Sequence, residues 1–200
     1  MTTSTIETND VRESILANGQ RIMAGKGFSA VGINEILTAS GVPKGSFYHY
    51  FGSKDAFGEA LLESYFKNYL ADLDATLSTP GLNMAQRLMG YWQSWQETQS
   101  ALDCQGKCLT VKLGAEVADL SETMRLALKR GTAGIIDRLA RAIEAGVAEG
   151  SLFVDDTPDA AAQSLYHLWL GASVMVKVVR NDQPFEMAMR TTRQILHLPR

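Results

Sequence analysis

The chain has 200 residues, 46% of them hydrophobic, and its 19 Lys and Arg against 22 Asp and Glu give a formal net charge of -3. This length and apolar content allow one or two domains with a sizeable buried core. The charge balance excludes a protein that is basic over its whole surface, so any contact with nucleic acid has to come from a local patch.

The N-terminal residues 1–9 are polar and rich in Thr, which argues against a signal peptide and predicts a disordered arm. A first amphipathic helix is predicted from Val11 to Gly25. The longest apolar run, residues 160–179, still contains Gln163 and Lys177, which argues against a membrane span. We therefore expect a cytoplasmic protein.

The next segment predicts two short helices joined by a tight turn. The first helix covers residues 33–40, Gly41 permits the turn, and Pro43 suits the first turn of the second helix. On that second helix Phe47, Tyr50 and Phe51 fall at i, i+3 and i+4 and are expected to face the core. This pattern is typical of a DNA-binding helix-turn-helix. The polar side chains expected to contact DNA are Lys44, Ser46, Tyr48 and His49, followed by Lys54.

Charge is concentrated where the predicted contact with DNA lies. Between residues 41 and 54 the charged side chains are Lys44 and Lys54, which gives +2 in a slightly acidic chain. A dimer would present this basic patch twice to one duplex.

The string GVPKGSFYHYFGSKDAF resembles the recognition helix of the TetR family of transcriptional regulators. The resemblance implies a helix-turn-helix domain over residues 1–52 and a ligand-sensing and dimerisation domain over residues 53–200. It also implies a homodimer that binds double-stranded operator DNA and responds to a small-molecule effector.

Glycine and proline separate the remaining helical segments, so an all-α fold is predicted. Ser53 is a plausible N-cap for a long helix, and Thr157 and Pro158 form a second start signal. The helices predicted after residue 52 cover residues 53–77, 84–102, 107–113, 121–149, 158–180 and 184–196.

The helix predicted over residues 158–180 carries two apolar stripes. In the family the last two long helices form the dimer interface, which implies that one of these stripes faces a partner. The stripe assigned to the interface consists of Ala161, Leu165, Leu168, Ala172 and Val176.

A second informative segment is GKCLTVKLGAEVADLSE, residues 106–122. It resembles the ligand domain of a TetR subgroup that includes repressors responsive to N-ethylmaleimide and regulators responsive to acrylate. In the electrophile-sensing branch the reactive cysteine corresponds to Cys108, and a lysine that can approach the oxidised cysteine corresponds to Lys177. Lys107 departs from the small residue usual in those relatives.

The residues around Cys108 give a separate argument for reactivity. Lys112 lies one helical turn away and the start of a helix supplies N–H groups, and both features would lower the pKa of the thiol. The alternative is that Cys108 packs as a small buried hydrophobe. Cys104 could pair with Cys108, although in a cytosolic chain both are expected to be reduced.

Aromatic residues provide weaker candidates for an effector pocket. Trp92, Tyr166 and Trp169 could line an apolar cavity or could belong to the ordinary core. We find no metal-ligand spacing, no phosphate loop and no nucleophile paired with a base, so the sequence predicts no cofactor, no metal and no enzyme activity. The hypothesis is a repressor released by a reactive electrophile or small unsaturated compound at Cys108. The alternative is a noncovalent carboxylate effector such as acrylate.

Overall fold

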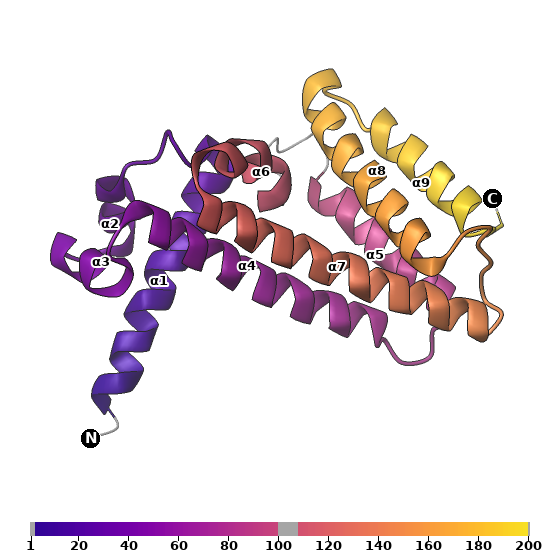
Figure 1. Cartoon of the computed structure of the whole chain (residues 1–200), viewed down its shortest axis with the longest axis horizontal. Helices are drawn as coiled ribbons and strands as arrows, with labels where there is room; N and C mark the ends of the chain where they lie inside the picture. Colours follow the sequence, from indigo (N-terminus) through magenta and orange to yellow (C-terminus); the bar gives the residue numbers. More distant parts are fainter. Residues whose placement is uncertain (1–2, 100–107, 200) are drawn as a thin grey trace. The chain divides into compact units, whose positions relative to one another are not determined.

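The structure is a computed structural model that describes residues 3–99 and 108–199, with side chains from residue 11 onward. Every regular element in these ranges is an α-helix, which confirms the predicted all-α fold (Figure 1). No described helix is both long and apolar enough to cross a membrane. The helices are α1 (Thr3–Lys26), α2 (Ile33–Ser40), α3 (Lys44–Phe51), α4 (Lys54–Leu77), α5 (Met84–Gln99), α6 (Leu109–Leu120), α7 (Glu122–Ala148), α8 (Pro158–Val179) and α9 (Gln183–Ile195).

The predicted turn and caps are present in the structure. Gly41 ends α2 with φ of 66°, a left-handed conformation that glycine adopts without steric cost. The Ser53 hydroxyl accepts a hydrogen bond of 3.1 Å from the Ala56 N–H at the start of α4. The Thr157 hydroxyl accepts one of 3.2 Å from the Ala160 N–H at the start of α8. Local sequence signals therefore fix where these helices begin and end.

Two predicted segments differ from the structure. The disordered arm predicted over residues 1–9 is wrong for the described part, because α1 begins at Thr3. The first 18 residues contain no glycine or proline that would stop a helix there. The helix predicted to end at residue 113 continues to Leu120 as α6. The buried side chains of Leu113 and Val117 hold the helix on both sides of Gly114.

Contacts between Cα atoms divide the chain into two compact units. The first unit is Met1–Lys67 with Cys108–Gly131, and the second unit is Asn68–Lys107 with Thr132–Arg200. The helix-turn-helix therefore shares a compact unit with the start of α4, with α6 and with the start of α7. The domain boundary predicted after residue 52 does not coincide with these units and remains a prediction.

Aromatic packing and close helix contact hold the first unit together. The rings of Phe47, Phe51 and Phe57 lie with centroids 5.0 to 5.3 Å apart, which attaches α3 to the start of α4. The helices α4 and α7 approach closely at Gly131, where a Cβ atom would lie 2.1 Å from the Phe66 ring. A larger residue than glycine would displace that ring.

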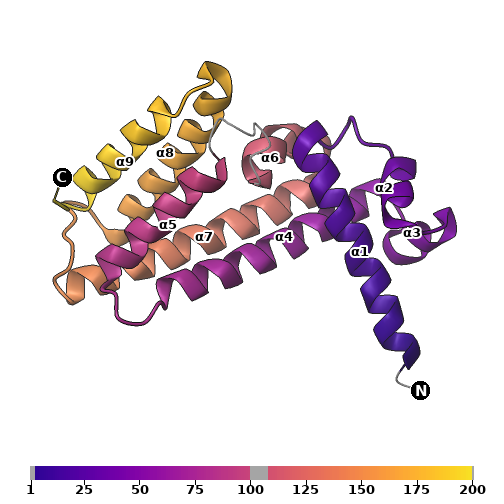
Figure 2. The ribbon, with the colours of Figure 1, turned by 180° about the vertical axis from the view of Figure 1, so that it is seen from behind.

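The core of the second unit is rich in tryptophan. The Trp92 and Trp169 rings stack with centroids 5.0 Å apart, and neither side chain is exposed. Two buried hydroxyls satisfy two of the indole groups, since Trp95 Nε1 donates to Ser173 Oγ and Trp169 Nε1 donates to Thr192 Oγ1, each over 2.9 Å, whereas the buried Trp92 Nε1 has no hydrogen-bond partner among the described residues. This second pairing joins α8 to α9, which lie side by side as an antiparallel pair (Figure 2).

Candidate nucleic-acid interface and thiol site

The helix α3 presents a polar face and buries an aromatic one. Phe47 and Phe51 are buried, whereas Tyr50, which was predicted to face the core, is only partly buried. Lys44, Tyr48 and His49 are exposed, and 46% of the Tyr48 surface is accessible. Lys44 and Tyr48 lie one turn apart on the same side of the helix, so they can contact one surface together. Ser46 is partly buried.

The first turn of α3 also exposes its backbone at Gly45. A Cβ atom at this position would meet no other atom within 4 Å, so internal packing does not require the glycine. A missing side chain here leaves room for close approach of another molecule to the backbone. Gly45 is not among the residues predicted from the sequence to contact DNA.

Lys54 differs from the exposed residues of α3. Its Nζ atom lies 4.6 Å from the centroid of the Phe28 ring and its charge acts on the carboxylate of Glu116. The side chain is partly buried. This cation–π contact means that Lys54 has a role inside the first unit, and its contact with DNA remains a prediction.

Cys108 lies at the N-cap position of α6 and is 5% exposed. Burial raises the pKa of its thiol. The N–H groups of Val111 and Thr110 and the hydroxyl of Tyr65 lower that pKa, but they do not offset the burial. Tyr65 belongs to α4, so the thiol is in contact with the helix that follows the recognition helix.

This result corrects the argument from sequence that nearby cations lower the pKa of Cys108. Lys112 is partly buried, and its backbone N–H donates to the Cys108 carbonyl over 3.2 Å. Its charge is not among the effects that shift the thiol. Lys107 and Cys104 lie outside the described residues. The N–H groups at the helix start do act in the predicted direction, but loss of hydration has the larger effect.

The carboxylate of Glu116 forms a contact that the sequence analysis missed. Its Oε2 accepts a hydrogen bond of 3.0 Å from the Phe28 N–H, and its Oε1 accepts one of 2.7 Å from the Ser29 N–H. Burial by itself would raise the pKa of Glu116, but the hydrogen bonds from Ser29 and Phe28 and the charge of Lys54 lower it overall. The carboxylate therefore ties α6 to the loop between α1 and α2.

The residues predicted to sense an effector are distributed over both units. Trp92, Tyr166 and Trp169 lie in the buried aromatic core of the second unit. Lys177 belongs to the same unit and is partly buried, whereas Cys108 and Lys112 belong to the first unit. The approach of Lys177 to Cys108 therefore remains a prediction.

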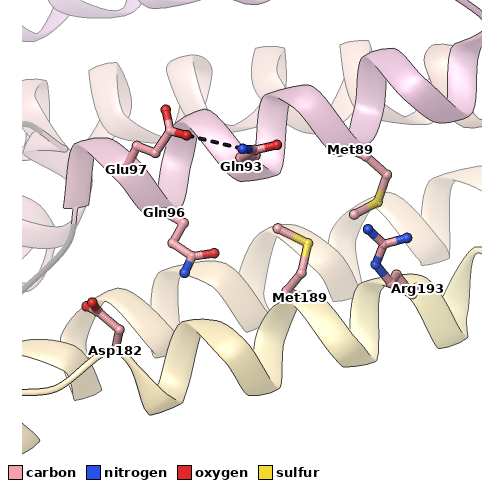
Figure 3. Close-up of a pocket in the computed structure, with 7 residues that line it drawn as sticks. All are labelled: Met89, Gln93, Gln96, Glu97, Asp182, Met189 and Arg193. Atoms are coloured by element: carbon pink, nitrogen blue, oxygen red, sulfur yellow. Dashed lines mark hydrogen bonds between the residues drawn. The ribbon is translucent and has the colours of Figure 1, made fainter. Parts of the chain in front are cut away.

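A groove between α5 and α9 crosses the second unit, with a volume of about 590 Å³ (Figure 3). Its walls combine two thioethers with amide and charged groups, and Gln93 Nε2 donates to Glu97 Oε1 over 3.3 Å. None of the predicted effector residues belongs to it. The lining residues are Met89, Gln93, Gln96, Glu97, Asp182, Met189 and Arg193.

The stripe of α8 assigned to a dimer interface is mostly covered by its own chain. Ala161, Leu165, Ala172 and Val176 are buried, and Leu168 is partly buried. Both stripes of α8 are apolar, so the sequence did not distinguish the inward face from the outward one. The exposed apolar side chains of α8 are instead Val174, Met175, Val178 and Val179.

Comparison with known proteins gives matches over nearly the whole chain. The family model for bacterial regulatory proteins of the tetR family matches residues 15–61, and that for the tetracyclin repressor-like C-terminal domain matches residues 84–192. The HTH-type transcriptional repressor NemR of Escherichia coli is 40% identical over 96% of both chains. The transcriptional regulator AcuR of Cereibacter sphaeroides is 33% identical, covering 90% of this chain and 82% of the relative.

Solved structures give the same result. A crystal structure of the reduced form of E. coli NemR matches with a TM-score of 0.90 and 42% identity, covering 95% of this chain and 98% of that chain. A TetR regulatory protein from Rhodobacter sphaeroides matches with a TM-score of 0.82 and 33% identity, covering 91% and 96%. The helix-turn-helix, the helical C-terminal part and these matches agree: the chain belongs to the TetR family of bacterial transcriptional regulators.

Proposed function

We propose that this protein is a transcriptional repressor that binds operator DNA as a homodimer and leaves it when an electrophile modifies Cys108. The observation that carries the proposal is the position of a buried thiol at the start of α6, in the same compact unit as the helix-turn-helix. The similarity to NemR, which is named as a repressor, supports the direction of regulation.

The exposed face of α3 supports contact with duplex DNA. Lys44 supplies a cation for a phosphate, and Tyr48 and His49 supply hydrogen-bonding groups at the same face. Contacts with phosphates position a recognition helix, and contacts with base edges give its specificity. One short helix reaches few bases, so a useful operator affinity requires two copies.

The exposed apolar side chains of α8 support a homodimer. Val178 is 66% exposed, and Val174, Met175 and Val179 are each more than 40% exposed. Burial of such a patch against a second copy would remove apolar surface from water. In the proposed dimer the two recognition helices would meet successive major grooves about 34–36 Å apart.

The proposed chemistry is addition of the Cys108 sulfur to an activated alkene. The sulfur forms a bond to one alkene carbon, the carbon–carbon π bond breaks, and the proton of the thiol ends on the neighbouring carbon. Only the thiolate adds efficiently, and the raised pKa keeps the thiol neutral at pH 7. At 5% exposure Cys108 is packed by its own chain, so the proposed adduct requires the start of α6 to repack.

A noncovalent carboxylate such as acrylate is the alternative effector. Lys112, Lys177 or Arg180 could receive its carboxylate, and the similarity to AcuR supports this class of ligand by analogy. A different class, a redox or small-molecule enzyme on a helical bundle, is not supported by the family, whose members are regulators.

Replacement of Lys44 with Ala tests the contact with DNA. If each copy of Lys44 neutralises one phosphate, the slope of log Kd against log salt concentration falls by about 1.8 for the dimer. Lys67→Ala, on an exposed part of α4, is the matched control and should leave the slope unchanged. Fluorescence anisotropy with labelled duplex from 50 to 300 mM salt measures both variants. An unchanged slope for Lys44→Ala would remove this residue from the interface.

The pH dependence of alkylation tests the state of the thiol. Burial raises the pKa of Cys108 above the ordinary cysteine value of about 8.5. The thiolate fraction should therefore still increase steeply with pH when the pH reaches that value. In a Cys104→Ser variant, the rate of reaction with iodoacetamide should therefore rise about tenfold per pH unit from pH 7 and show no plateau by pH 9. Intact-mass measurements follow the rate. A plateau below pH 8 would show a stabilised thiolate and contradict the structure.

Release from DNA tests the proposed function itself. N-ethylmaleimide should release the wild-type protein and the Cys104→Ser variant from a duplex taken upstream of its own gene, but not the Cys108→Ser variant. A gel shift with methylglyoxal and acrylate in parallel separates the effector classes. Release of Cys108→Ser by acrylate would favour the carboxylate alternative, and its release by N-ethylmaleimide would exclude the covalent mechanism at Cys108.

A further inference from the structure

The loop between α1 and α2 is held by a carboxylate from a distant part of the chain. Glu116 accepts from the N–H groups of Phe28 and Ser29 at 3.0 and 2.7 Å, and these residues are 88 and 87 positions away in sequence. They lie just beyond the C-terminus of α1 and lead into the helix-turn-helix. The carboxylate uses one oxygen for each donor, so its orientation is fixed.

The residues next to the Glu116 carboxylate leave room for it and add a favourable charge. Gly27 has φ of +91°, and a Cβ atom there would lie 2.9 Å from the Glu116 Oε2. A side chain at residue 27 would therefore push the carboxylate away from its two donors. Lys54, at the start of α4, adds favourable charge from above the Phe28 ring. Three segments of the first unit thus converge on one carboxylate: the loop, α4 and α6.

The same helix carries the thiol at its other end. Cys108 is the N-cap of α6, and Glu116 lies about two turns further along, or ~12 Å by the rise of an α-helix. The buried side chains of Leu109, Leu113 and Val117 run along the helix between and around these two residues. We expect a helix packed in this way to move as a rigid element, so repacking at its start would displace Glu116.

Ser29 is exposed, so water could satisfy its N–H if the carboxylate were absent, whereas Phe28 is buried and its N–H depends more on Glu116. Glu116 belongs to α6, and its hydrogen bonds hold the α1–α2 loop, which leads into the helix-turn-helix, against that helix.

We propose that Glu116 is the residue that couples modification of Cys108 to the position of the helix-turn-helix. The coupling rests on the proposed function, because it requires that modified protein binds the operator more weakly. In unmodified protein the carboxylate holds the α1–α2 loop in the arrangement that binds DNA. Adduct formation at Cys108 shifts α6, and the two hydrogen bonds from the Phe28 and Ser29 N–H groups to Glu116 break, which releases the loop.

The test compares operator affinity before and after complete modification with N-ethylmaleimide in a Cys104→Ser background. The ratio of the two Kd values measures the coupling for each variant, and intact mass confirms one adduct per chain. Glu116→Gln keeps the size of the side chain but loses the charge and one acceptor. The ratio should fall by roughly fivefold or more relative to the parent protein.

The matched control is Glu149→Gln. Glu149 also accepts a backbone N–H, from Met84, and the hydroxyl of Ser151, but it belongs to the second unit. This variant should keep the parent ratio. Gly27→Ala provides an independent route to the same loss, because the added Cβ displaces the carboxylate while Glu116 is retained. Circular dichroism confirms that each variant is folded.

Amide hydrogen exchange separates the coupling from the proposed function. The Phe28 and Ser29 amides should be protected in the parent protein, lose protection after modification, and exchange rapidly in Glu116→Gln with or without the adduct. An unchanged Kd ratio in Glu116→Gln, or protection that modification does not alter, would overturn the coupling while leaving release by Cys108 intact. A ratio near 1 in the parent protein would instead overturn the proposed function and the coupling with it.

Discussion

A single helix, α4, makes the covalent connection between the recognition helix and the residues that follow it. It begins at Lys54, directly after the Ser53 cap, and continues to Leu77 without a break. It also passes from the first compact unit into the second. A change in the residues after α4 can therefore reach α3 along α4, or through side-chain contacts within the first unit.

The thiol site is connected to both of these routes. The Tyr65 hydroxyl of α4 acts on the Cys108 thiol, and Glu116 connects the same helix, α6, to the loop after α1. The N-cap position of Cys108 means that a change there affects the first turn of α6 directly. A small chemical event at one buried atom can thus alter two contacts of the helix-turn-helix unit.

Burial of Cys108 affects both the reactivity of the thiol and the access of reagents to it. A neutral thiol with a raised pKa reacts slowly with most reagents, and an exposed fraction of 5% limits the access of a reagent to the sulfur. In the proposed mechanism modification has a large structural effect, because a packed interior does not absorb additional atoms without rearrangement. Low intrinsic reactivity and the proposed strong response both follow from the same burial.

Much of the fold could be predicted from local sequence. Gly41, Ser53 and Thr157 act through their own backbone or hydroxyl, so their effects appear in a single sequence. The polar face of α3 also followed from spacing, because a short helix with two buried phenylalanines leaves its other side exposed. The family resemblance was confirmed by matches over almost the entire chain.

Other features depend on contacts between distant segments and could not be predicted. Burial raises the pKa of Cys108, whereas the neighbouring lysines in the sequence suggested that it would be lowered. The contact of Glu116 with Phe28 joins residues 88 positions apart. On α8, apolar residues occupy both the covered and the exposed sides, so spacing alone did not separate the core stripe from the exposed valines.

The central claim is that modification of Cys108 and operator binding exclude each other. The most direct measurement is to modify about half of a protein sample with N-ethylmaleimide, pass it over immobilised operator DNA, and determine by peptide mass spectrometry the modified fraction of Cys108 in each pool. Modified Cys108 is expected in the unbound pool and unmodified Cys108 in the bound pool. Equal modified fractions in the two pools would contradict the claim.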